Sequence, residues 1–324
     1  MKEMFRLLKG GNKPSLLAAI VNAFIGLLKG VSFFFTGNVA MFAEMMHSLG
    51  DAANQLFVFI GSALSKKAPT PKFPNGFGRV VNLVCLGAVI IVAILSYETI
   101  VEGFHQVMHP VESSGMVLNI IVLAVAVLLE LSVWHKAAEE ILAEAQVEAK
   151  GLQFFSKSFV HLNKARPATK LVFMEDTVAT LGGILAILSI IISHFTGLRQ
   201  AEGIASIIIG VMMFYVVGKI FLENARGAIG ETDEEMRMHI ANLILADPDI
   251  KDIQRLTVLK EGEHLHVKAE VEISPAIAFS QADDIKDRLY TLIMAQNHVT
   301  DVLIEFDRYD DIQHWQTNQP DPVR

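Results

Sequence analysis

Residues 39–64 read VAMFAEMMHSLGDAANQLFVFIGSAL, an apolar segment long enough to cross a bilayer as a helix. Its polar interruptions are Glu44, His47, Asp51, Asn54 and Gln55. A charged side chain near the bilayer centre costs about 2.5 to 3.5 kcal/mol on insertion scales, so such a residue is normally retained because it serves a function. The segment therefore predicts a membrane helix that carries a polar site.

Five more segments of spanning length accompany this one. With it, the expected spans are residues 14–36, 39–64, 79–106, 114–135, 170–194 and 201–224. The composition agrees, because 52% of the residues are hydrophobic and the mean hydropathy is +0.42, above that of an ordinary soluble domain. We predict a membrane domain of six transmembrane helices over residues 1–224.

The charges of the connecting segments predict how the helices are oriented. Basic residues gather between the second and third spans and between the fourth and fifth, whereas the other connections hold one basic residue among them. Because Lys and Arg are retained on the cytoplasmic side, both termini and the long loop 136–168 are expected in the cytosol. The first half of that loop is rich in Ala and Glu, which predicts a helical extension of the fourth span over 137–149.

The N-terminal segment is expected to remain on the protein. Basic residues precede the first apolar stretch, as they do in a signal peptide, but the stretch from Ser15 to Phe35 is longer than the core of one.

The last hundred residues have a different pattern, in which charged and apolar residues alternate. Helices are expected over 233–246 and 280–296, and strands over 253–260, 265–273 and 302–306. This order, αββαβ, predicts a small cytosolic α+β domain over residues 225–310. Residues 311–324 are polar and contain prolines, and we expect them to form a flexible tail.

Charge and cysteine content exclude several classes of function. The net charge is -8, so a nucleic acid is not an expected partner. The single cysteine, Cys85, lies in an apolar stretch and cannot form a disulfide framework or a paired-cysteine zinc site within one chain.

The candidate metal ligands lie on the second and fifth spans. His47 and Asp51 stand four residues apart and share one helix face, with Asn54 one turn further along. An imidazole and a carboxylate supply half of a tetrahedral zinc site. The fifth span adds Glu175 and Asp176, whose side chains point about 100° apart, so one of them, Asp176 by our expectation, faces the pair on the second span.

Less specific interpretations remain open for these residues. His47 and Asp51 could form a buried structural pair, and Glu175 could be a solvated residue near the helix end. Glu44 fits either an exit step for an ion or proton, or a plain interfacial position. Lys29 in the first span is expected to reach the interface or pair with a carboxylate.

Two histidines in the tail have a spacing that can bind metal. His264 and His266 alternate by two and so share one strand face. Surface histidines near a hairpin are commoner than ligands, so a regulatory metal site here is the weaker of the two interpretations.

The motifs HSLGD (47–51) and FPNGFGR (73–79), together with the αββαβ tail, resemble those of the cation diffusion facilitators, the zinc-transporter family of proton-coupled metal exporters. The resemblance spans nearly all of the chain. HSLGDAANQ (47–55) and FMEDTVATLGG (173–183) most resemble the branch that includes human zinc transporter nine. The resemblance to the family implies six transmembrane helices, a ferredoxin-like cytosolic domain and a homodimer.

The resemblance also implies a set of transport-site residues. His47, Asp51 and Asp176 take three positions of the family's site, and the fourth is occupied by Val172, which offers no ligand atom. Glu175, Asn54 or water would then complete the shell. An oxygen-rich shell leaves Mn²⁺, Fe²⁺, Co²⁺ and Mg²⁺ open beside Zn²⁺.

Members of the family often hold a second metal cluster in the tail. The positions that resemble it are Gln254, Lys268, Glu305 and Asp307. A glutamine and a lysine cannot replace histidine ligands, so we expect this regulatory site to be absent or rebuilt.

The sequence therefore predicts a secondary active antiporter, and no enzyme, that exports Zn²⁺ from the cytoplasm in exchange for protons by alternating access. The expected partners are the transported metal ion, protons, the lipid bilayer and a second copy of the chain, with no cofactor, in the inner (plasma) membrane of a prokaryote. Two rival classes are an intramembrane metalloenzyme and a membrane-anchored interaction protein. The first has little support, because no HExxH motif occurs and no second histidine joins His47.

Overall fold

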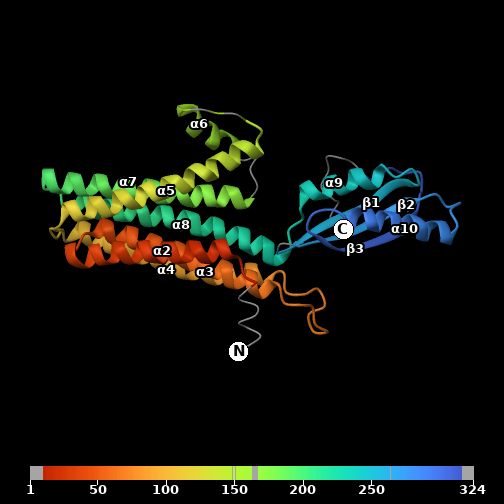
Figure 1. The fold of residues 1–324 in the computed structure, drawn as a ribbon, viewed down its shortest axis with the longest axis horizontal. Helices are drawn as coiled ribbons and strands as arrows, with labels where there is room; N and C mark the ends of the chain where they lie inside the picture. Colours follow the sequence, from red (N-terminus) through yellow and green to blue (C-terminus); the bar gives the residue numbers. More distant parts are fainter. Residues whose placement is uncertain (1–9, 148, 150, 163–166, 263, 316–324) are drawn as a thin grey trace. The chain divides into compact units, whose positions relative to one another are not determined.

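The computed structural model describes residues 10–147, 149, 151–162, 167–262 and 264–315 (Figure 1). The chain forms two compact units. The first consists of Met1–Ala63 and Val84–Asn224, and the second of Leu64–Leu83 and Ala225–Arg324. The basic N-terminal residues before Gly10 lie outside the described residues.

Long helices make up the first unit. They are α2 (Lys13–Thr36), α3 (Val39–Ser65), α4 (Val80–Met108), α5 (Met116–Glu144), α7 (Pro167–Thr196) and α8 (Gln200–Ile229). Among the described residues, five of these helices, α2, α4, α5, α7 and α8, are long and apolar enough to cross a membrane. Each expected span is thus a helix, but α3 is too polar to join the five on hydropathy alone.

Glycines bring α4 and α8 into close contact. A Cβ atom placed on Gly203 would lie 2.6 Å from the carbonyl oxygen of Gly103, and one on Gly103 would lie 2.8 Å from the carbonyl oxygen of Gly203. Small residues let the backbones of membrane helices approach in this way. Side chains of α3, α5, α7 and α8 form an apolar core that includes Met41, Leu123, Ile190, Ile209 and Met213.

The fourth span continues beyond its expected membrane boundary, as its Ala/Glu-rich sequence predicted, and α5 ends at Glu144. The short helix α6 (Leu152–His161), which follows Gly151 with its positive φ of 61°, was not predicted. Trp134 stacks on Phe155 and lies close to Phe173, and its Nε1 donates to Thr177 Oγ1 at 2.8 Å. These rings give α5, α6 and α7 a common aromatic core.

The C-terminal domain has the predicted element order. It consists of α9 (Glu234–Leu245), β1 (Ile250–Glu261), β2 (His264–Ile273), α10 (Phe279–Met294) and β3 (Val299–Arg308). The sheet order is β1-β2-β3, with β1 antiparallel and β3 parallel to β2. Alternate residues of β2, such as Val267 and Val271, are buried with Ile240 of α9 and Leu289 of α10, so the helices cover one face of the sheet.

The segment Leu64–Leu83 belongs to this second unit, and the loop that it contains between α3 and α4 meets the β1–β2 turn. A Cβ atom on Gly78 would lie 2.4 Å from the carbonyl oxygen of Glu261. Arg79 Nη2 lies 2.9 Å from Glu261 Oε1. The loop therefore depends on a glycine at position 78 for its closest approach.

The segment after β3 differs from the flexible tail that the sequence led us to expect. The amide of Tyr309 donates to the carbonyl of Ile273 at 3.0 Å, and the amides of His314 and Trp315 donate to the Asp252 carboxylate. Trp315 is 8% exposed, and the Arg237 guanidinium lies 5.0 Å from its ring centroid. Residues 316–324 of the expected tail lie outside the described residues.

Candidate metal centre

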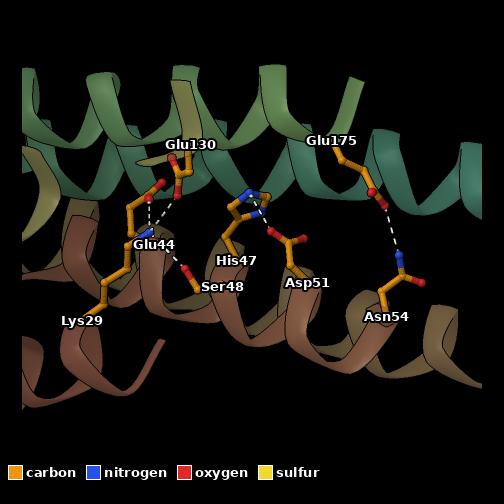
Figure 2. A network of polar contacts seen from close by, with 8 residues as sticks. All are labelled: Lys29, Glu44, His47, Ser48, Asp51, Asn54, Glu130 and Glu175. Carbon is orange, nitrogen blue, oxygen red and sulfur yellow. Dashed lines mark hydrogen bonds and ion pairs between the residues drawn. The ribbon is translucent and has the colours of Figure 1, made fainter. Parts of the chain in front are cut away.

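His47 and Asp51 lie together on one face of α3, as their spacing predicted (Figure 2). His47 Nε2 is 3.5 Å from Asp51 Oδ2. His47 is 5% exposed, and within the described structure its Nε2 has no hydrogen-bond partner. A buried imidazole nitrogen without a partner is a favourable metal ligand, because binding an ion would replace the water that it lost on folding.

One turn further along, Asn54 contacts the fifth expected span. Asn54 Nδ2 donates to Glu175 Oε1 at 3.1 Å, so this contact joins α3 to α7 (Figure 2). His47, Asp51, Asn54 and Glu175 line a common small cavity, whose lining also includes apolar side chains of α4 and α8, namely Val92, Met213, Val216 and Ile220. Its volume, about 10 Å³, is close to the least that holds one water-sized species.

Asp176 has a different position from its neighbour. Its Oδ2 is buried without a hydrogen-bond partner among the described residues. As far as the structure describes it, the lining of the cavity includes Glu175 and leaves Asp176 out. In this conformation, Glu175 rather than Asp176 extends toward Asn54.

The side chains of the four candidate ligands do not converge on one position in this conformation. Within the described part of the chain, no three of His47, Asp51, Glu175 and Asp176 offer ligand atoms that all lie within 4.8 Å of one another. The arrangement is two half-sites, one on α3 and one on α7. To hold one ion between these residues, α7 would have to move against α3.

A second polar network lies about one turn away on α3, and the sequence identified it only in part. Lys29 of α2 is fully buried, and its Nζ donates to Glu44 at 2.8 Å and to Ser48 at 3.0 Å, and lies 3.4 Å from Glu130 of α5 (Figure 2). Of the two interpretations of Lys29, the ion pair is the one observed. Glu130, a lone acid in the apolar run LLELS, was missed, and its isolation was the available signal.

Two glycines of α7 make room for this network. A Cβ atom on Gly182 would lie 2.7 Å from Glu44 Oε1, and one on Gly183 would lie 3.8 Å from Glu130 Oε2. Both carboxylates keep one oxygen buried without a partner among the described residues, namely Glu44 Oε1 and Glu130 Oε2. In this network, the single ammonium group of Lys29 is paired with two carboxylates, those of Glu44 and Glu130.

The remaining candidates are not arranged as metal ligands. Val172 on α7 is 40% exposed and offers no donor atom. His266 lies between two acids, with Nε2 3.4 Å from Glu261 Oε2 and Nδ1 3.5 Å from Asp301 Oδ2. His264, on the same strand, is exposed. Both histidines line one open pocket together with Glu261 and Asp301, but only His266 lies within ion-pair distance of the acids.

Comparison with known proteins gives two matches to family models that together cover most of the chain. Residues 15–227 match the model described as the cation efflux transmembrane domain, and residues 232–309 match that of the cation efflux protein, cytoplasmic domain.

Individual relatives agree with these matches. The chain is 27% identical over 273 residues to the proton-coupled zinc antiporter SLC30A9, mitochondrial, of Mus musculus and of Homo sapiens, which covers 82% of this chain and 46% of theirs. It is 26% identical over 267 residues to the zinc transporter ZitB of Escherichia coli, covering 79% of this chain and 75% of that protein. The chain thus spans about half the length of the mammalian relatives.

Proposed function

The chain belongs to the cation efflux family, the cation diffusion facilitators, and from this premise we propose that it carries a divalent metal ion, most readily Zn²⁺, across a membrane in exchange for protons. The observation that carries the proposal is the pairing of His47 and Asp51 on α3 opposite two carboxylates of α7, beside a cavity about as small as one ion. The relatives are named as transporters or antiporters and not as enzymes.

For this role, α3 must be the sixth membrane helix. It runs over Val39–Ser65, longer than α2, and its low hydropathy comes from the polar residues that the proposed site requires. Glu44, His47 and Asn54 are all buried. Polar side chains that face the interior of a helix bundle do not meet lipid, so the segment can span the bilayer despite them.

The proposed ligands are His47, Asp51 and Asp176, with Glu175 and Asn54 as further candidates. When α3 and α7 bind the ion together, the rotation of α7 determines whether Glu175 or Asp176 reaches the ion. Support for a moving α7 comes from the two half-sites, which lie near each other without converging. Alternating access would then consist of closing the half-sites on one side of the membrane and opening them on the other.

Competition at His47 gives a physical basis for proton coupling. Only the neutral imidazole binds a metal ion, and carboxylate ligands must also be deprotonated. A proton that enters from one side therefore expels the ion, and its departure on the other side restores the site. Because these are the ligands themselves, proton and metal cannot occupy the site together.

The choice of Zn²⁺ rests on the zinc-transporting relatives and on the single imidazole ligand. The absence of a fourth family ligand at Val172 makes Mn²⁺, Fe²⁺, Co²⁺ and Mg²⁺ the alternatives.

We also propose a homodimer, a ferredoxin-like C-terminal domain and both termini in the cytosol of a prokaryote. The mammalian relatives are mitochondrial by name, while others are bacterial.

Reconstitution into liposomes tests the proposal directly. Purified chain should show uptake of Zn²⁺ that His47→Ala and Asp51→Ala each abolish, because either change removes half of the α3 ligand pair. Glu98→Gln is the matched control, since it alters another acid of a membrane helix that is exposed and outside the cavity. A panel of Mn²⁺, Fe²⁺, Co²⁺ and Mg²⁺ identifies the cargo.

The same experiment separates the rival classes. Unchanged flux in both α3 variants would discard the ligand assignment. Peptide cleavage without ion flux would favour a metalloenzyme, and full complementation by a chain lacking all three proposed ligands would favour an interaction protein.

A further inference from the structure

We propose that the C-terminal domain binds a divalent transition-metal ion between Asp252 of β1, Glu272 of β2 and His314 of the segment after β3, and that the ion fastens this segment to the domain. One ligand atom from each of the three lies within 4.8 Å of the other two. These residues differ from the positions that resemble the family's tail cluster, Gln254, Lys268, Glu305 and Asp307.

The two carboxylates are held together by the sheet itself. Asp252 and Glu272 are directly opposite in the β1–β2 register, and each is 1% exposed. Like charges directly opposite on neighbouring strands are destabilising, and burial increases that cost. Two buried carboxylates this close are stabilised by a positive charge or a proton between them.

The protein supplies only part of that charge. His314 Nδ1 lies 3.3 Å from Glu272 Oε1 and 3.7 Å from Asp252 Oδ2. Even a protonated imidazole offers one positive charge against two negative ones. Glu272 Oε2 is buried with no hydrogen-bond partner among the described residues, so the site also contains an unused ligand atom. A divalent ion with neutral His314 would balance both carboxylates.

The distances match those of a metal-bound set. Nitrogen and oxygen ligands lie about 2.0 to 2.2 Å from a tetrahedral zinc ion, which places them about 3.3 to 3.6 Å from one another. The two separations from His314 Nδ1, 3.3 and 3.7 Å, are close to this range. One imidazole and two carboxylates suit Zn²⁺, Fe²⁺, Co²⁺ or Mn²⁺ better than Mg²⁺ or Ca²⁺, which prefer oxygen ligands alone.

Binding at this site would act on the end of the chain. His314 precedes Trp315, which is buried in the core of the domain beside Arg237. The amides of both tail residues already donate to Asp252. A metal ligand at position 314 would therefore strengthen the docking of Trp315, and loss of the ion would weaken it.

Tryptophan fluorescence offers a local readout. The chain has two tryptophans, so Trp134→Phe leaves Trp315 as the single reporter. The full chain in detergent, carrying Trp134→Phe and Asp51→Ala to remove binding at the membrane centre, is titrated with Zn²⁺ and, separately, with Co²⁺ and Mg²⁺. We expect saturable changes in Trp315 emission with Zn²⁺ and Co²⁺ at one ion per chain, and none with Mg²⁺ at the same concentrations.

Substitutions at position 314 decide the assignment. His314→Gln should weaken Zn²⁺ binding at least about 10-fold, since even loss of an outer partner of a metal ligand has an effect of that size. His314→Cys, which restores a zinc ligand, should recover most of it. His264→Gln removes an exposed histidine of the same domain and should leave binding unchanged.

Two results would overturn the proposal. One is that the Trp315 emission of the parent chain does not change when Zn²⁺ or Co²⁺ is added. The other is a His314→Gln chain that binds with the parent affinity. Circular dichroism on each variant identifies misfolding, and the Cys variant supplies the answer if the Gln variant misfolds. Neither readout requires transport, so failure of this site and failure of the proposed transport function are separate results.

Discussion

Lys29 shows how much a single buried charge can decide in this protein. It is fully buried and compensates Glu44 and Glu130, which come from two other helices. Removing one member of a buried charge cluster leaves the others uncompensated, which costs more than the pair contributes. The lysine is therefore required for the packing of α2, α3 and α5, whatever part it has in transport.

Lys29→Met should lower the stability of the membrane unit by about 3 to 5 kcal/mol, the usual cost of breaking a buried ion pair. The measurement is thermal unfolding of the purified chain in detergent. Lys219→Met is the matched control, because Lys219 is an exposed lysine of α8 and should tolerate the change. Equal stability of the two variants would contradict the role of the buried pair.

A second residue-scale effect belongs to the C-terminal domain. Hydrogen bonds from Arg288 lower the pKa of Asp247, and the same contacts raise the pKa of Arg288. A lowered pKa in the folded state means that the pair stabilises the domain above the ordinary Asp pKa of about 4. That contribution is lost as the pH falls below about 4 and through the lowered pKa.

Arg288→Gln should therefore destabilise the domain at neutral pH and have a diminishing effect as the solution becomes acid. Denaturant unfolding of the Trp134→Phe chain, followed by Trp315 emission from about pH 7 to pH 3, measures the difference from the parent. A difference that stays constant or grows toward acid pH would show that the ion pair is not its source.

At the scale of elements, the contact between α4 and α8 depends on the absence of side chains. Gly203→Ala would place a methyl group 2.6 Å from a backbone oxygen of Gly103, and backbone cannot yield as a flexible side chain does. We expect a loss of about 1 to 3 kcal/mol, as for other overpacked sites. Thermal unfolding in detergent measures it.

The matched control lies on the same helix. A Cβ atom on Gly218 would meet nothing within 4 Å, so Gly218→Ala should be neutral or stabilise α8 by up to about 1 kcal/mol. If both alanine variants behaved alike, helix propensity rather than close packing would explain the result.

The loop between α3 and α4 offers another element-scale test. Gly78→Ala would force the loop away from the β1–β2 turn, because its Cβ would lie 2.4 Å from the Glu261 carbonyl oxygen. The loop lysines, Lys66, Lys67 and Lys72, should then be cut faster by trypsin. Asn75→Ala changes an exposed residue of the same loop and should leave the cleavage rate as it is.

These elements also show which parts of the fold could be predicted. Helix positions followed from the length of apolar runs, and the αββαβ order followed from alternation, since both are local properties of the chain. The helix α6 was missed although its apolar residues, such as Phe155 and Phe159, recur at helical spacing, because ten residues are too few to be found by the length of an apolar run. The docking of Trp315 was missed because its partners, Asp252 and Arg237, are distant in the sequence.

At the scale of the whole molecule, proton coupling makes transport depend on the pH gradient. Since protons and the metal ion compete for the same ligands, liposomes acidic inside should take up Zn²⁺ faster than liposomes without a gradient. A protonophore should remove the difference. The Asp51→Ala chain provides the control. If the rate of uptake by the parent chain were independent of the pH gradient, transport would not be coupled to protons.

The sequence alone determined the membrane helices and the pairing of His47 with Asp51. Apolar length and helical spacing act within one element, so no partner is needed to deduce them. The tertiary structure decided which acid of α7 reaches Asn54, because adjacent residues differ by about 100° and the rotation of a helix depends on its packing. It also joined Lys29 to Glu130, 101 residues away, and gathered Asp252, Glu272 and His314, since such contacts depend on how separate segments meet.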